Sequence, residues 1–149
     1  MNLSRMRARG VTAAALGALA ATTLTVADAG ASPAAAAAPQ KRQIASSVLG
    51  DDYKITLTAL RSTQDRYAAS VRLQVYKKVG GAWKESDRVT VGDVGGWFWY
   101  PLTGSGAVCQ FSTAGTEPAP LTVSLLLTPS LGCSEPAHYV VKQGRVHAD

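Results

Sequence analysis

A strict alternation of apolar and polar side chains runs through the middle of this chain and limits it to extended structure. In Tyr53–Arg61, with the sequence YKITLTALR, apolar residues occupy alternate positions, and Tyr67–Lys78 repeats the pattern with Val71, Leu73 and Val75. Successive side chains of a strand point to opposite faces, so this period of two predicts strands that bury one face only. The pattern favours antiparallel sheets, which can leave one face in water.

Further segments of the same character follow. Gly80 and Gly81 predict a tight turn between the second strand and a third, because both glycines accept positive φ. The additional predicted strands are Trp83–Val91, Trp97–Tyr100, Ala107–Thr113, Leu121–Thr128 and His138–Lys142. About seven short strands with Gly, Pro and Ser turns indicate a sandwich or a small barrel. We therefore predict an all-β fold, a small antiparallel β-sandwich with immunoglobulin-like or Greek-key connections and one disulfide.

The N-terminal segment has the composition of a secretory signal. Three arginines, at positions 5, 7 and 9, precede the uncharged run Val11–Val26, and small residues then allow cleavage after Ala29 or Ala31. The run is shorter than the about 20 strongly apolar residues that span a bilayer, although an uncleaved membrane anchor is the alternative. The predicted organisation is a signal peptide at 1–31, an Ala/Pro-rich disordered linker at 32–43 and one domain at 44–149. This predicts a secreted, extracellular protein.

Charge and hydropathy narrow the range of partners. The chain carries 15 basic and 10 acidic residues, and removal of the signal peptide leaves 12 and 9, or a net charge of +3. No basic cluster is longer than a pair such as Lys77–Lys78, which argues against a nucleic-acid partner. No apolar run after the signal is long enough to cross a bilayer, so no membrane association is expected after cleavage.

The two cysteines, Cys109 and Cys133, predict a disulfide bond. They are an even number in a chain with an export signal, and only one pairing is possible. A metal site is not indicated, because there is no C-x-x-C motif and the only histidines are His138 and His147. We therefore expect no metal and no cofactor.

The segment GGWFWYP, Gly95–Pro101, places four aromatic residues side by side. In a strand, Trp97 and Trp99 point one way, whereas Phe98 and Tyr100 point the other. One face of a sandwich strand meets solvent, so one pair is expected to be exposed and available to a cell-wall polysaccharide or an extracellular protein. The candidate ligand-binding residues are Trp83, Trp97, Trp99 and Tyr100, with Phe98 and Tyr100 as the alternative pair. The competing interpretation is that all of them pack in the core.

Catalysis is not expected, because no G-x-S-x-G motif is present, His138 falls in a predicted terminal strand and His147 falls in a C-terminal tail that is expected to fray. The proline-rich segment 128–136, TPSLGCSEP, suggests a second function, that of a protease inhibitor or antagonist with a loop held by Cys133. The overall format resembles that of small secreted actinobacterial protease inhibitors. That family has two disulfides and this chain can form one, so no residue role is transferred. A passive structural surface protein is the third possibility.

Overall fold

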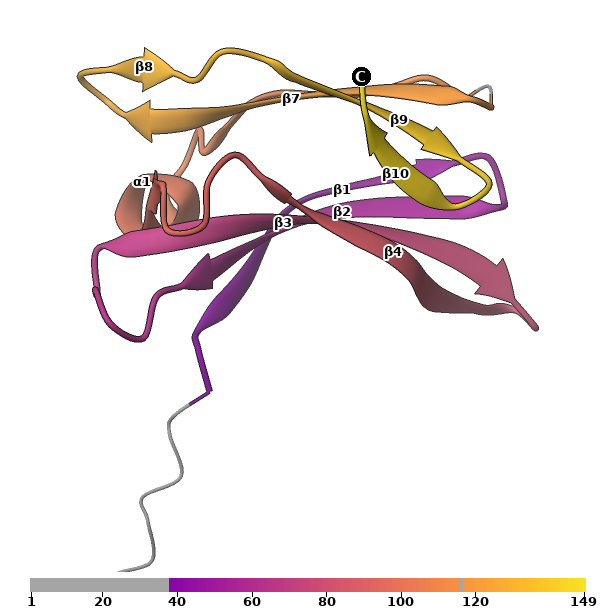
Figure 1. Ribbon diagram of the computed structural model, residues 1–149, viewed down its shortest axis with the longest axis horizontal. Helices are drawn as coiled ribbons and strands as arrows, with labels where there is room; N and C mark the ends of the chain where they lie inside the picture. Colours follow the sequence, from indigo (N-terminus) through magenta and orange to yellow (C-terminus); the bar gives the residue numbers. More distant parts are fainter. Residues whose placement is uncertain (1–37, 116) are drawn as a thin grey trace, which may run out of the picture. The chain divides into compact units, whose positions relative to one another are not determined.

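Residues 38–115 and 117–149 are described by the computed structural model, and they form ten strands and one short helix (Figure 1). The strands are β1 (Lys41–Leu49), β2 (Tyr53–Arg61), β3 (Ala68–Val79), β4 (Ala82–Val91), β5 (Trp97–Phe98), β6 (Val108–Thr113), β7 (Ala119–Thr128), β8 (Gly132–Cys133), β9 (Ala137–Lys142) and β10 (Arg145–Ala148); the helix is α1 (Trp99–Thr103). The predicted signal peptide, residues 1–31, and linker residues 32–37 lie outside the described part. Nowhere in that part is there a helix with the length and hydrophobicity to cross a membrane.

The strands form two antiparallel sheets that pack face to face (Figure 1). The first sheet has the order β1-β2-β3-β4, with β5 also paired to β3, and the second has the order β10-β9-β7-β6, with β8 also paired to β7. The predicted all-β sandwich is confirmed. Each sheet is a meander of strands that follow one another along the chain. Immunoglobulin-like and Greek-key connections instead return a strand beside an earlier one or transfer it to the other sheet. This arrangement does not have them.

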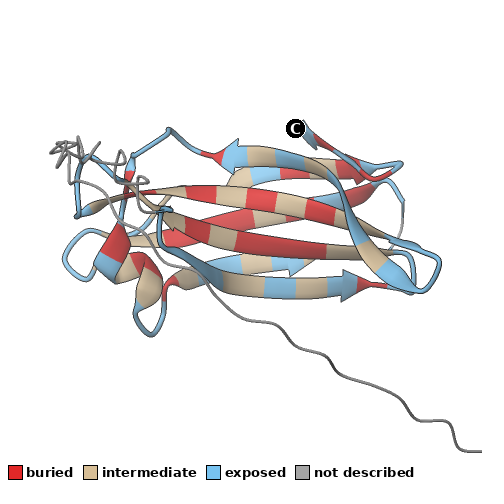
Figure 2. Ribbon diagram, turned by 90° about the horizontal axis from the view of Figure 1, so that it is seen from below, coloured by how far each residue is buried: buried red, intermediate tan, exposed pale blue. Residues whose placement is uncertain are grey.

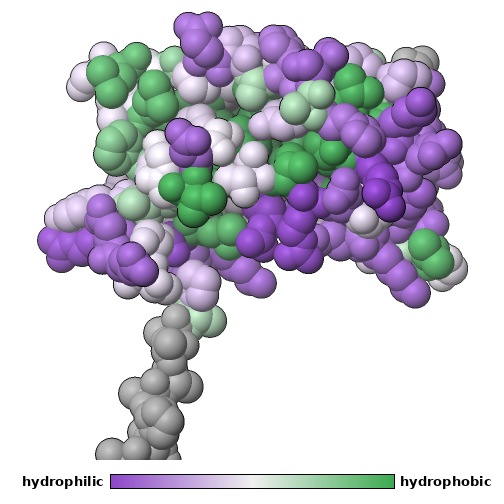
Figure 3. Space-filling model, viewed as in Figure 1, coloured by the Kyte–Doolittle hydropathy of each residue, from purple (hydrophilic) through white to green (hydrophobic). Residues whose placement is uncertain are grey.

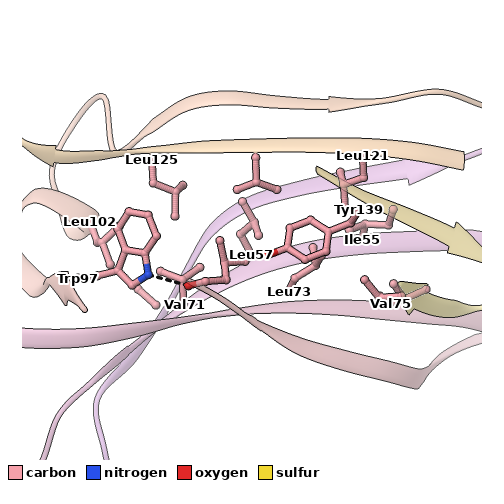
Figure 4. Close-up of a cluster of buried hydrophobic side chains, with 14 of the residues drawn as sticks. Ile55, Leu57, Val71, Leu73, Val75, Trp97, Leu102, Leu121, Leu125 and Tyr139 are labelled. Atoms are coloured by element: carbon pink, nitrogen blue, oxygen red, sulfur yellow. Dashed lines mark hydrogen bonds between the residues drawn. The ribbon is translucent and has the colours of Figure 1, made fainter. Parts of the chain in front are cut away.

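The core lies between the two sheets and consists of the apolar side chains that point inward from alternate positions of the strands. Ile55, Leu57 and Leu73 of the first sheet face Leu121 and Leu125 of the second, and all five side chains are fully buried (Figure 4). Buried positions follow the central strands as stripes, whereas exposed positions dominate the edges (Figure 2). Burial of each such side chain contributes about 1.5–3 kcal/mol, which makes this double layer the main source of stability.

The β3–β4 hairpin has the turn that its sequence predicts. Gly80 and Gly81 have φ values of 60° and 81°, and Val79 pairs with Ala82 on either side of them. Two successive positive φ values are typical of the two-residue turns that match the twist of a hairpin. The turn fixes the register in which β4 pairs with β3 at the edge of the first sheet.

The first edge contact joins β1 to β6, the outermost strands on one side of the sandwich. The Oγ atom of Ser47 lies 3.1 Å from the Oγ1 atom of Thr113, so a hydrogen bond links the two sheets there. β1 begins at Lys41, within the segment predicted as linker, because its pairing with β2 starts opposite Leu60. The sandwich is therefore held along this side by polar contacts as well as by its core.

The second edge contact joins β10 to β4 on the opposite side. Ser86 donates a hydrogen bond from Oγ to the carbonyl oxygen of Gly144 at 2.6 Å. Gly144 has a φ of +76°, a conformation that other residues adopt only with strain, and the Lys77 side chain packs where a Cβ atom would lie. The C-terminal hairpin consequently lies tightly against β4.

The carboxylate of Asp87 completes this contact and makes it sensitive to pH. It accepts the backbone N–H of Val146 at 2.9 Å and that of Arg88 at 2.9 Å. The hydrogen bond from Val146 is the main reason that the pKa of Asp87 lies below its ordinary value of 3.8. A lowered folded-state pKa stabilises the fold above the unfolded-state pKa of about 4, and this contribution is lost as pH falls through the folded value.

We therefore expect the stability of the wild type to fall more steeply below about pH 4 than that of Asp87→Asn, which has no carboxylate at this position. The measurement is the free energy of unfolding in urea between pH 7 and pH 2 for both proteins. Curves that run parallel over the whole range would show that Asp87 does not contribute to the acid sensitivity.

Candidate functional site

The aromatic segment begins as a strand and continues as a helix. Trp97 and Phe98 form β5, which pairs with Ala69 and Ala68 at the start of β3. The backbone N–H of Trp99 still bonds to the carbonyl oxygen of Tyr67 at 2.8 Å, but α1 begins at this residue. The prediction of a strand through Tyr100 is therefore wrong. Pro101 falls in the first helical turn, where its missing N–H is not needed and its fixed φ suits the helix.

The two tryptophans of the segment lie in the core. Trp97 is 7% and Trp99 is 9% exposed, and the indole N–H of Trp97 donates to the carbonyl oxygen of Val91 at 2.7 Å. The Trp97 ring extends between the sheets near Leu102 and Leu125 (Figure 4). Buried rings cannot offer a surface to a ligand. The contact predicted for Trp97 and Trp99 is thus not available, and the alternative pair remains.

Trp83 lies far from this segment. It pairs with Lys78 at the end of the β3–β4 hairpin, whereas β5 pairs with Ala69 near the other end of β3. At about 3.3 Å per residue, the nine residue steps from Ala69 to Lys78 separate these positions by roughly 30 Å. The Lys78 ammonium group instead lies over the Trp83 ring, 5.8 Å from the ring centroid. The predicted extension of the aromatic surface by Trp83 is therefore not present.

The outward-facing aromatic residues of this end are exposed. Tyr100 is 57% and Phe98 is 46% exposed, and Tyr67, immediately before β3, is 51% exposed. The Tyr67 and Tyr100 ring centroids are 6.1 Å apart with an angle of 53° between the ring planes. Phe98 pairs with Ala68 and therefore lies on the outer face of the first sheet. On the side seen in Figure 3, hydrophobic side chains gather at the left and across the middle, and hydrophilic ones border them.

Two arginines complete the site with Tyr67 and Tyr100. The guanidinium carbon of Arg61 is 5.6 Å from the Trp99 ring centroid and 5.7 Å from that of Tyr100. The guanidinium carbon of Arg66 is 4.7 Å from the Tyr67 ring centroid. Such cation–π contacts favour fixed positions for both partners. We refer to Arg61, Arg66, Tyr67 and Tyr100 as the aromatic–arginine cluster.

Hydrogen bonds hold Arg61 in place at the centre of the cluster. Its Nε atom donates to the carbonyl oxygen of Arg66 at 2.9 Å, and Nη1 donates to Oε1 of Gln40 at 2.8 Å. A weaker bond of 3.4 Å joins Nη2 to the Tyr100 hydroxyl. A guanidinium has five N–H donors, so two of them remain for a ligand.

The turn before β3 positions Arg66 and Tyr67. The Ser62 hydroxyl accepts the backbone N–H groups of Gln64 and Asp65 at 3.2 Å each, and the Asp65 carboxylate accepts that of Tyr67 at 2.8 Å. These local bonds are typical of Ser and Asp in turns. The Asp65 carboxylate, the acidic group nearest to the cluster in sequence, is therefore engaged with a backbone N–H group.

An open groove borders the cluster. Its volume is about 650 Å³, and it runs between the segment 38–40 and the β2–β3 turn, with Gln40, Arg61 and Arg66 in its lining. No carboxylate lines it. The groove offers N–H donors beside the exposed tyrosine rings, a combination that suits a ligand with a flat apolar face and oxygen acceptors.

Tyr100 and Phe98 are predicted from the sequence, whereas Arg61, Arg66 and Tyr67 are not. These three residues flank the polar turn between β2 and β3, which the sequence marks only as a connection. They meet Tyr100 because β5 pairs with the start of β3. The pair Arg66–Tyr67 at a turn is a sequence signal for such a site. It does not identify Tyr100 as the partner.

The disulfide confirms the predicted pairing of Cys109 with Cys133. It joins β6 to β8, and both of these strands pair with β7. The segment 128–136 contains a hairpin, because Gly132 pairs with Thr128 and Leu131, which is 69% exposed, forms the turn before it. A substrate-like inhibitor loop needs free backbone groups to pair with the protease as an added strand. Here β7 already pairs with part of that backbone, so the geometry favours the aromatic–arginine cluster over this loop.

No group of three or more His, Cys, Asp or Glu residues within 38–115 and 117–149 is arranged to hold a metal ion. Comparison of the chain with known protein families, curated proteins and solved structures found no match. The geometry of the cluster is consequently the basis for a functional hypothesis.

Proposed function

We propose that this chain is a secreted, non-catalytic binding module that holds a cell-wall polysaccharide through the aromatic–arginine cluster. The observation that carries the proposal is the exposed Tyr67–Tyr100 pair with two arginines fixed against its rings. Grouped exposed aromatic side chains on a small domain mark interaction sites. The N-terminal sequence pattern supports secretion, and a disulfide is suited to an oxidising compartment.

The chemistry of the cluster matches that of a sugar ring. The C–H face of a pyranose is apolar and can pack on a tyrosine ring, while its hydroxyl groups accept hydrogen bonds from guanidinium N–H groups. Arg61 is already held by Gln40 and Arg66, so it loses little conformational entropy when a ligand binds. These features support a preformed site that can hold a sugar without a large rearrangement.

The test is retention of the purified domain on insoluble cell-wall polysaccharide. Tyr100→Ala is expected to weaken binding by about 2- to 10-fold, because an aromatic contact contributes about 0.5–1.5 kcal/mol. Tyr100→Phe keeps the ring and is expected to bind nearly as well as the wild type. Trp83→Ala removes an aromatic side chain at the distant hairpin and serves as the matched control. Equal retention of the wild type and Tyr100→Ala, or no retention of either, would refute the proposal.

A further inference from the structure

A second groove lies on the outer face of the first sheet, next to the cluster. Its volume is about 780 Å³, and its walls include the β2–β3 turn and the residues 94–95 between β4 and β5. The side chains that give it its chemical character are those of Lys41, Leu60, Ser70, Arg72 and Thr90. We refer to it as the outer-face groove.

Strand pairing places these side chains on one face. Lys41 pairs with Leu60, Leu60 pairs with Ser70, and Arg72 pairs with Thr90. Directly paired residues project to the same side of a sheet, here the side opposite to the core. The backbone N–H of Gly95 donates to the Ser70 hydroxyl at 2.8 Å and holds one wall of the groove in place.

The outer-face groove is basic and its cations are not neutralised by protein. Lys41, Arg61 and Arg72 line it, and no Asp or Glu does. In the part of the chain that the structure describes, the only ion pair is Glu85–Arg88, which lies outside the groove. Clefts lined by one sign of charge attract ligands of the opposite sign.

The outer-face groove is continuous with the groove that borders the aromatic–arginine cluster. The lining of both includes Arg61 and the turn residues 62–64. Arg61 pairs with Ala69, whose side chain is buried, so the Arg61 side chain leaves the end of β2 on the core side, whereas Arg72 projects from the outer face. Arg72 lies three residues farther along β3, roughly 10 Å along the strand, so a ligand that contacts both must pass round the end of the sheet. A ligand that contacts both ends must therefore be a chain of several units and not a single small sugar.

We propose that the ligand is an anionic polymer. Its sugar or polyol units pack on Tyr67 and Tyr100, while phosphate or carboxylate groups farther along it bind Arg72 and Lys41 in the outer-face groove. This inference rests on the proposed function and adds the charge and the minimum length of the ligand. Because salt screens exposed charges, binding of the charged polymer weakens as ionic strength increases.

The probes are neutral dextran, carboxymethyl-dextran and phosphorylated dextran, with affinities measured at two salt concentrations. Both charged dextrans are expected to bind more tightly than neutral dextran, and the stronger one identifies the preferred anion. Arg72→Gln and Lys41→Gln are each expected to weaken binding of that dextran by about 3- to 10-fold and to leave neutral dextran unaffected. Lys84→Gln removes the same charge outside the groove and is expected to have little effect.

The outcomes separate the two proposals. If all three dextrans bind equally and Tyr100→Ala weakens all of them, the polysaccharide site stands and the anionic groove is refuted. An equal loss for Arg72→Gln and Lys84→Gln would also refute the groove, because net charge alone would explain it. Tighter binding of a single-stranded DNA oligonucleotide than of any dextran would contradict the assigned ligand class. If the wild type binds no dextran but is retained on cell-wall polysaccharide through Tyr100, the anionic groove is refuted and the proposed function stands; if it binds neither, both proposals fail.

Discussion

Replacement of Trp97 by alanine is expected to lower the free energy of unfolding by about 3–5 kcal/mol, a large share of the about 5–15 kcal/mol typical of small domains. The ring is almost fully buried between the sheets, and its loss would leave a cavity near Leu102 and Leu125. The carbonyl oxygen of Val91 would also lose the indole N–H that it accepts. Urea denaturation of the variant, followed by circular dichroism, measures the effect.

Two further variants resolve the origin of this loss. Trp97→Phe keeps much of the apolar volume but removes the N–H donor, so it is expected to cost less than Trp97→Ala. Trp83→Ala removes a partly exposed ring of the same type and is expected to cost much less, because little apolar area leaves the core. A similar cost for Trp83→Ala and Trp97→Ala would contradict the central position of Trp97.

Removal of the disulfide is expected to destabilise the protein by about 3–4 kcal/mol. The bond closes a loop with a sequence separation of 24 residues. Without the bond, the unfolded chain gains conformational entropy in this loop, and that gain lowers the free energy of unfolding. The double variant Cys109→Ala/Cys133→Ala should therefore unfold at a clearly lower temperature than the wild type. Thermal unfolding at neutral pH measures the difference.

A reducing agent provides the internal control for the disulfide. Both cysteines are exposed, so a small thiol can reach the bond in the folded protein. Reduction should lower the midpoint of wild-type unfolding to nearly that of the double variant and leave the variant unchanged. If fully reduced wild type unfolds at the same temperature as the oxidised form, the bond does not stabilise the fold.

The central strands could be predicted from the sequence because each carries its own signal. Tyr53–Arg61 was expected from its alternation and has the bounds of β2, and the Gly80–Gly81 turn lies where it was expected. In both cases the information is local, since a strand with one buried face needs an apolar residue at alternate positions. Segments of this type make up most of the two sheets.

The edge strands and the helix could not be predicted in the same way. β1 and β10 are largely exposed, so neither needs an alternating pattern, and each forms because the register of its neighbour supplies hydrogen bonds. α1 has five residues and no helical period that a sequence could show. Its aromatic composition favours a strand, but the chain must turn there to pass from the first sheet to the second.

The candidate site was only partly visible for a related reason. The alternation along Trp97–Tyr100 predicted that one pair would be exposed, and Phe98 and Tyr100 are exposed although the strand ends after Phe98. The arginines are more than thirty residues away in sequence, and strand pairing alone brings them to Tyr100. Sequence patterns identify faces, whereas a site assembled from different strands depends on register.

The polar contacts along the two open sides of the sandwich have a consequence for self-association. Ser47 meets Thr113 on one side, and Asp87 binds the backbone of Val146 on the other. An outermost strand with unpaired backbone groups is a template on which further copies of a chain can stack into fibres. At these points an incoming strand would first have to displace a neighbour from the same molecule. These two contacts therefore shield part of each edge against a strand from another copy.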